Sequence, residues 1–188
     1  MNSINLKIKM IFVIMSIALI SGCTTSVGKI KKLPGYDKKI SNVSVTWHMP
    51  TNLRTKIKIS GHGKPKVGPE EREKSKKGIK TLLSLFSEYS VDMVSDKLIK
   101  SSVLISPSSD TSLQKLKLTA TQADTECVPI GCTHNLWIRA YIIDVKLNQA
   151  VWTGYFKVGK PYANESDKNA IESFSKSLVD ELKSSDLI

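Results

Sequence analysis

The sequence predicts a single α+β domain in which a mostly antiparallel sheet carries two amphipathic helices packed on one face. Two observations lead to this fold class. The patterns along the chain run strand, strand, helix, strands, helix, an order typical of α+β proteins. The 188 residues are 40% hydrophobic and 24% charged, a balance that excludes collagen-like, fully disordered and multi-spanning membrane proteins. A chain of this length can bury one cooperative core without metal or many disulfides.

The N-terminal segment, residues 1–22, is predicted to be a signal peptide. Lys7 and Lys9 precede an apolar run from Met10 to Ile20, which is shorter than the roughly 20 residues that a membrane-spanning helix needs. A basic start, a short apolar run and small residues after it are typical of secretory signals. The segment Leu19–Cys23, with the sequence LISGC, resembles the lipobox of bacterial lipoproteins.

The lipobox resemblance implies that the chain is cut before Cys23, and that this cysteine is lipidated on its thiol and acylated on its new amino group. Two or more acyl chains hold a protein stably on a bilayer. Thr24 follows the cysteine, where the family carries Asp for retention at the inner membrane. In a Gram-negative cell the resemblance therefore implies a lipid-anchored outer-membrane protein that faces the periplasm; Gram-positive bacteria use the same signal. The alternative is an ordinary secretory signal in which Cys23 is not modified.

Residues 23–40 are expected to form the lipidated cysteine and a basic tether, and residues 41–188 the domain. The tether segment mixes Thr, Ser, Gly and Pro with five lysines: Lys29, Lys31, Lys32, Lys38 and Lys39. Few apolar positions interrupt it, which favours a linker. Positive charge is concentrated here and just beyond, because residues 23–80 hold 15 Lys and Arg against 4 Asp and Glu.

Apolar and polar residues alternate over residues 42–48 and 53–59, which predicts two strands. In the second strand, the residues expected to face the core are Leu53, Ile57 and Ile59. Three cations alternate with them on the outer face: Arg54, Lys56 and Lys58. We expect this face to make an electrostatic contact with an acidic envelope partner or an anionic surface. The alternative is a solvated face, or a charged edge that discourages edge-to-edge pairing.

A helix is expected to begin near Pro69, because proline suits the first helical position and the glutamates that follow complement the positive helix end. Its apolar residues recur about every 3.6 positions as far as Val94, with a break expected near residues 87–90. A short strand is expected at 103–105. A second amphipathic helix is expected from about residue 165 to 183, with four apolar residues on one stripe: Ile171, Phe174, Leu178 and Leu182.

Three segments between these helices, 113–126, 134–147 and 150–158, are rich in β-branched and aromatic residues and predict an antiparallel meander. The core side of the last strand is expected to hold Trp152, Phe156 and Val158. The hairpin of residues 141–155, followed by a helix, faintly resembles small periplasmic lipoproteins of the curli-secretion and TolB N-terminal kind. The resemblance covers only this part of the chain, contains no diagnostic motif and implies no function.

Once Cys23 is assigned to a lipid, Cys127 and Cys132 remain, separated by a segment with two turn formers, Pro129 and Gly131. In an oxidising compartment we expect a disulfide between them. Closing so small a loop contributes about 2 kcal/mol in the chain-entropy model. The alternative is a zinc site with His134 as a third ligand. Zinc sites usually show a second ligand pair downstream, and the sequence has none, so we expect no metal and no cofactor.

Candidate catalytic residues lack a supporting motif. The sequence has no Gly-x-Ser-x-Gly elbow, and in Gly61–Lys64 the glycine spacing and the proline after the lysine depart from a phosphate-binding loop. A catalytic set would have to draw on one of the histidines, His48, His62 or His134. Asp144 is a candidate buried carboxylate with a raised pKa, or else a residue that lies on the wet face or caps a backbone group.

The basic composition does not indicate nucleic-acid binding, because base recognition relies on arginine and only Arg54, Arg72 and Arg139 are arginines. Export also separates the protein from the genome. Two function classes remain: a non-catalytic binding or assembly module anchored in the envelope, and a lipid-anchored hydrolase acting on envelope polymers. The absence of a catalytic motif in the sequence favours the first class.

Overall fold

The computed structural model describes residues 24–59, 68–108, 110–128, 131–161 and 167–188. The predicted signal peptide, Cys23 and the segment Gly61–Lys64 with His62 lie outside these residues, so predictions about them stay predictions. Within the described ranges, no helix combines the length and the hydropathy needed to cross a membrane.

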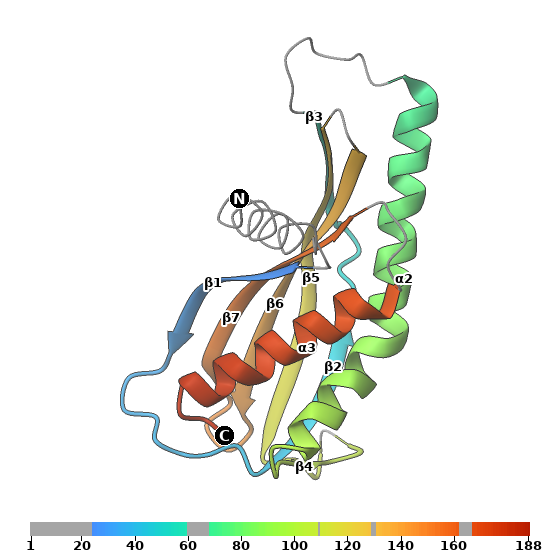
Figure 1. The fold of residues 1–188 in the computed structure, drawn as a ribbon. Helices are drawn as coiled ribbons and strands as arrows, with labels where there is room; N and C mark the ends of the chain where they lie inside the picture. Colours follow the sequence, from blue (N-terminus) through green and yellow to red (C-terminus); the bar gives the residue numbers. More distant parts are fainter. Residues whose placement is uncertain (1–23, 60–67, 109, 129–130, 162–166) are drawn as a thin grey trace, which may run out of the picture.

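The described residues form the predicted α+β fold, with one seven-stranded sheet and two helices on the same face of it (Figure 1). The strands along the sheet are β1 (Thr24–Lys32), β7 (Gln149–Pro161), β6 (Gly131–Asp144), β5 (Gln114–Val128), β2 (Asn42–His48) and β4 (Leu104–Ile105). A further strand, β3 (Arg54–Ile59), pairs with β5 beyond the end of β2. The helices are α2 (Pro69–Ile99) and α3 (Asp167–Ser184).

The predicted meander is confirmed, since β5, β6 and β7 pair antiparallel in sequence order. The two early strands pair differently, because β2 and β3 both run parallel to β5. β2 and β3 pair with consecutive stretches of β5. β2 pairs with residues 114–119 and β3 with residues 122–127. The register of β5 against β6 shifts between these two stretches, at Ala120/Gln122, so the bulge marks the boundary between them.

The core lies between the sheet and the helices. The residues predicted for the last strand, Trp152, Phe156 and Val158, are at most 1% exposed, and the four predicted stripe residues of α3 are fully buried. The ring of Phe174 from α3 contacts Phe156 of β7 at 5.4 Å and Phe86 of α2 at 5.8 Å, measured between ring centroids. One aromatic cluster therefore joins both helices to the sheet.

The predicted break in the first helix is wrong, because α2 runs without interruption for 31 residues. It begins at Pro69 as expected, and Glu71 accepts a hydrogen bond from the Gly68 N–H. Ser90 explains the error. This serine is fully buried, and it continues the core-facing stripe four residues after Phe86 and four before Val94. A small polar residue at a core position looks like an interruption in the sequence, but it occupies the correct face of the helix.

The predicted tether is also wrong, because residues 24–32 form β1, which pairs antiparallel with β7 from Thr24↔Gly159 to Lys32↔Trp152. The register shifts between Val27 and Ile30, which removes the strict alternation that would have identified a strand. The following segment packs as well, since Tyr36 and Ile40 are 6% and 4% exposed. Residues 24–40 therefore belong to the folded domain.

Candidate functional site

One face of the sheet is turned away from both helices, and we call it the open face. Side chains of successive strand residues point to opposite faces, and on the central strands one set is buried under the helices. The other set is half-buried and comprises Lys115, Lys117, Thr119, Trp137, Arg139, Tyr141, Thr153, Tyr155 and Lys157. Among the described residues, the alternation of burial at these positions shows that the helices cover one face, although Asp124 and Asn135 are buried at open-face positions near the end of the sheet.

Cations on the open face are stacked on aromatic rings. The guanidinium carbon of Arg139 lies 4.6 Å from the ring centroid of Tyr141 and 4.8 Å from that of Tyr155. The Lys157 Nζ lies 5.2 Å from the ring centroid of Trp137. Such contacts contribute about 0.5–1 kcal/mol each at exposed sites. The Arg139 Nε has no hydrogen-bond partner in the described part of the chain, so stacking, more than hydrogen bonding, holds this side chain.

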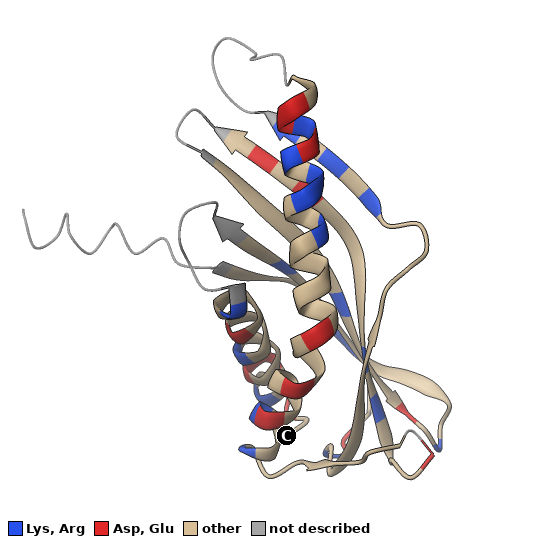
Figure 2. Cartoon of the chain, turned by 90° about the vertical axis from the view of Figure 1, so that its right-hand side faces the viewer, with Lys and Arg blue, Asp and Glu red and all other residues tan. Residues whose placement is uncertain are grey.

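The predicted contact strand belongs to the same face, because Arg54, Lys56 and Lys58 are all exposed and their register partners are open-face residues of β5. Eight cations lie at open-face positions: Lys31, Arg54, Lys56, Lys58, Lys115, Lys117, Arg139 and Lys157. The acidic residues there are Asp124 and Glu126. Figure 2 shows the basic residues of β3 beside the N-terminal half of α2.

Lys58 has a different role from its two neighbours. Its Nζ lies 3.4 Å from Oδ2 of Asp124, whose side chain is 1% exposed, and the other carboxylate oxygen accepts a 2.8 Å hydrogen bond from Asn135. A buried carboxylate needs such partners, and removing one is strongly destabilising. Lys58 thus compensates a buried charge. Arg54 and Lys56 form no ion pair with any described residue, so they are the part of the predicted set that is available to a partner.

The expected inward face of β3 is less buried than predicted. Leu53 and Ile57 are half-buried, and the side chain of Ile59 lies outside the described residues. A cavity of about 360 Å³ separates β3 from the N-terminal half of α2 and is lined by Thr55, Lys56, Ile57, Arg72, Lys76 and Ile79. Arg72 and Lys76 therefore lie across the cavity from β3 on the helix side of the sheet, whereas the register with Asp124 puts the Lys56 side chain on the open face. Nothing in the sequence indicates this, because the helix brings them there from a separate element.

Cys127 and Cys132 form the predicted disulfide, with their Cα atoms 4.0 Å apart at paired positions of β5 and β6. His134 does not join them. Its Nδ1 lies 2.8 Å from the Thr125 hydroxyl, and the ring is 6% exposed beneath Gly78 of α2. The zinc alternative does not fit this arrangement, since the two sulfur atoms are bonded to each other.

Asp144 is a structural carboxylate. It accepts hydrogen bonds from the Tyr36 hydroxyl and the Leu147 N–H, both at 3.0 Å, and lies 3.4 Å from the Lys38 ammonium. Burial alone would raise the pKa of Asp144, but these three partners together lower it below the usual value. The expected raised pKa is therefore wrong, and the alternative of a backbone cap is confirmed.

The candidate catalytic residues that the structure describes, His48, His134 and Asp144, are not brought together. Asp144 and His134 lie on the same strand, roughly 33 Å apart at about 3.3 Å per residue, and His48 is exposed at the end of β2. Neither His134 nor Asp144 lines the cavity beside β3 or the second cavity, between α2 and α3.

Comparison with solved structures finds several bacterial proteins at low identity and low structural similarity. No protein-family model and no curated protein matches the sequence. A PelC dodecamer from Paraburkholderia phytofirmans is 11% identical over 80% of this chain and 96% of its own, with a TM-score of 0.43. Lipoprotein GNA1162 from Neisseria meningitidis is 9% identical over 77% and 99%, with a TM-score of 0.38.

A putative neuraminyllactose-binding hemagglutinin homolog from Helicobacter pylori is 11% identical over 83% of this chain and 94% of its own, with a TM-score of 0.41. With TM-scores below 0.5, these likenesses say nothing about what this chain binds.

Proposed function

We propose that this protein is a lipid-anchored lipoprotein of the bacterial outer membrane, facing the periplasm, and that it is a non-catalytic binding module whose open face contacts an anionic partner. One observation carries the proposal: eight cations and three aromatic rings occupy the sheet face that no described element covers. The two acidic residues on that face leave a large excess of positive charge, and one of them is already matched by Lys58.

The stacking of Arg139 indicates which chemical groups of a ligand the open face can bind. The two tyrosine rings pack against the guanidinium group, and a stacked guanidinium keeps its in-plane N–H donors for a ligand. Those donors match the two oxygens of a carboxylate or a phosphate. The rings of Trp137, Tyr141 and Tyr155 add apolar contact area beside the charges, which is the composition of the central part of many protein-binding surfaces.

The expected lipid anchor on Cys23 is a second, independent argument for the same proposal. The lipobox-like segment Leu19–Cys23 implies lipidation, and an anchored protein meets the anionic components of the envelope at high local concentration. Basic segments close to an anionic membrane gain roughly 1 kcal/mol per charge. Arg54 and Lys56 are the two exposed cations of β3 outside the Lys58–Asp124 ion pair, and this attraction would use them.

The test is salt-dependent binding of the lipid-free mature chain to anionic vesicles and to envelope fractions. The Debye length falls from about 10 Å at 0.1 M salt to about 3 Å at 1 M, so binding should be clear at low salt and lost at high salt. The double variant Arg54→Gln/Lys56→Gln and the single variant Arg139→Gln should both weaken it.

A matched control removes two exposed cations of α2 that are not on the open face, in the variant Lys77→Gln/Lys80→Gln. The control should bind like wild type. If the wild-type chain, the open-face variants and the control bind equally at every salt concentration, the open face is only a solvated surface and the proposal fails.

A further inference from the structure

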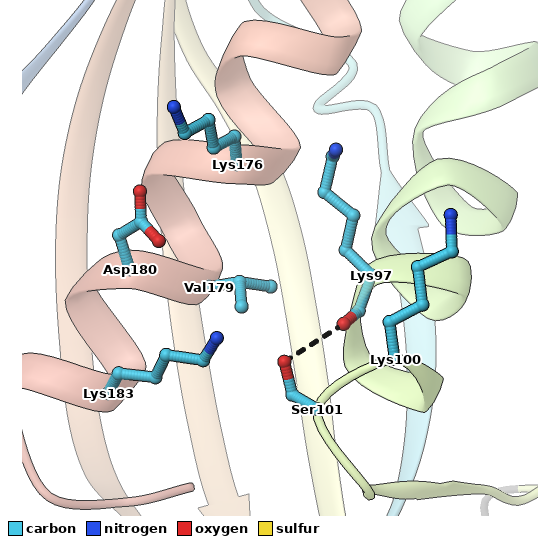
Figure 3. A pocket seen from close by; sticks show the side chains of 7 residues that line it. All are labelled: Lys97, Lys100, Ser101, Lys176, Val179, Asp180 and Lys183. Atoms are coloured by element: carbon cyan, nitrogen blue, oxygen red, sulfur yellow. Dashed lines mark hydrogen bonds between the residues drawn. The ribbon is translucent and has the colours of Figure 1, made fainter.

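We propose a second anion site, on the opposite side of the sheet from the open face, that binds a phosphate group in the pocket between the C-terminal ends of α2 and α3. The pocket has a volume of about 190 Å³. Four lysines line it, two from each helix region: Lys97, Lys100, Lys176 and Lys183. Figure 3 shows them on the two sides of the pocket, with Val179 and Ser101 between them.

The pocket carries more positive charge than its own residues neutralise. Lys97 is the most buried lysine for which an ion pair is found, with a side chain 27% exposed, and its Nζ lies 3.6 Å from Oε1 of Glu172. Glu172 lies outside the lining, whose acidic residue is Asp180. Among the described residues, no carboxylate lies within ion-pair distance of Lys100, Lys176 or Lys183. Like charges gathered in one place repel each other, and a multivalent anion would relieve that repulsion.

Neutralisation of the negative C-terminal ends of the helix dipoles explains the position of only some of these four lysines. Cations near a helix C-terminus interact favourably with the helix dipole, but the effect is confined to the last turn. Lys97 and Lys183 lie in the last turns of α2 and α3, and Lys100 is the C-cap of α2. Lys176 lies two turns before the end of α3, where the dipole gives no reason for a lysine.

Several carbonyl oxygens at the end of α2 are already hydrogen-bonded, so the lysines have only the negative end of the helix dipole to outweigh there. Free carbonyl oxygens at a helix C-terminus would repel an anion. Here the Ser101 hydroxyl donates to the Lys97 carbonyl at 3.1 Å. The Lys100 and Ser101 N–H groups donate to the carbonyls of Asp96 and Leu98 at 3.1 and 2.9 Å. These oxygens are occupied, so the polar side-chain groups of the lining are the four lysine ammonium groups, the Ser101 hydroxyl and the Asp180 carboxylate, and the positive groups outnumber the negative one.

The number and type of donors indicate the ligand class. Each ammonium group is a compact charge with three donors, and lysine binds phosphate as a point charge. A single carboxylate would compensate one of the four lysines, whereas a phosphate group presents several oxygens to lysines on both helices. The phosphate could belong to a soluble phosphate compound or to a lipid headgroup, and the experiment separates these sources.

The experiment uses the mature lipoprotein in a neutral detergent, titrated by calorimetry with inorganic pyrophosphate and, separately, with dihexanoyl phosphatidylglycerol below its micelle concentration. The test variant is Lys176→Gln/Lys183→Gln, and the control Lys77→Gln/Lys80→Gln removes the same charge far from the pocket. We expect saturable binding to wild type and control, and at least tenfold weaker binding to the test variant, with an unchanged circular dichroism spectrum.

Loss of pyrophosphate binding in the test variant would support a soluble phosphate compound, and loss of phosphatidylglycerol binding alone would support a headgroup. Equal binding of both probes to wild type and test variant, or no saturable binding of either probe to wild type, would overturn the proposal. The open-face variant Arg54→Gln/Lys56→Gln separates the two proposals, because it should retain pocket binding even if the open face has no partner.

Discussion

Replacing Gly78 by alanine tests how closely α2 lies against the sheet. A Cβ atom at this position would lie 2.0 Å from Nε2 of His134, and 2.5 and 2.7 Å from two carbons of the same ring. Non-bonded carbon atoms prefer about 3.5–4.0 Å. The ring cannot simply swing aside, because it is 6% exposed and its other nitrogen is 2.8 Å from the Thr125 hydroxyl.

Two opposing terms set the size of the effect. Glycine to alanine inside a helix is favourable by about 1 kcal/mol. Overpacking a buried site usually costs about 1–3 kcal/mol, and a contact with three atoms of a fixed ring belongs at the upper end of that range. We therefore expect Gly78→Ala to lower the free energy of unfolding by about 1–2 kcal/mol. For a domain of this size that corresponds to a fall in Tm of roughly 2–8 °C.

Thermal and urea denaturation followed by circular dichroism would measure this change, and a double-mutant cycle would assign it. In the His134→Ala background the obstructing ring is gone, so Gly78→Ala should become stabilising by about 1 kcal/mol, the helix-propensity term alone. Ser84→Ala, at an exposed position of the same helix, is the control and should change stability by less than about 0.5 kcal/mol. A Gly78→Ala single variant more stable than wild type would refute the close packing of α2 on His134.

Three further predictions concern the anchor, the disulfide and the buried carboxylate. Cys23→Ala should leave an unprocessed or soluble precursor; normal maturation and membrane fractionation of the variant would disprove the lipid anchor. Thiol labelling of the unreduced mature protein should find Cys127 and Cys132 unreactive, and replacing both by alanine should destabilise the fold by only about 2 kcal/mol. The lowered pKa of Asp144 stabilises the fold above the unfolded value of about 3.9, and this stability is lost as pH falls through the folded-state pKa. The stability difference between wild type and Asp144→Asn should therefore shrink between pH 6 and pH 2.5, and a difference that does not change with pH would contradict the assignment.

Much of the fold could be predicted because its elements carry strong local periodicity. The meander, the stripe of α3 and the start of α2 at Pro69 all follow from the spacing of apolar residues and from one proline. The two wrong predictions about the fold, the break in α2 and the tether in place of β1, have local causes. Ser90 occupies a core position with a polar side chain, and the register shift between Val27 and Ile30 hides β1.

The candidate sites depend on tertiary contacts that no local pattern encodes. The exposed cations of β3 were visible in the sequence, but the pairing of Lys58 with Asp124 arises only when β3 joins β5. The stacking of Arg139 between Tyr141 and Tyr155 depends on the register of β6 and β7. The lysine pocket joins the ends of two helices that are far apart in the sequence, so it could not be found before the helices were packed.

The position of β1 determines how far the protein could reach from a membrane. A flexible segment over residues 24–40 would extend up to roughly 55 Å at about 3.3 Å per residue, enough to sample a deep layer of the periplasm. With Thr24 already paired to Gly159, a lipid on Cys23 would be joined to the folded sheet by a single residue step of about 3.8 Å. The domain would then move with its lipid in the plane of the bilayer, and its partners would have to come within contact distance of that surface.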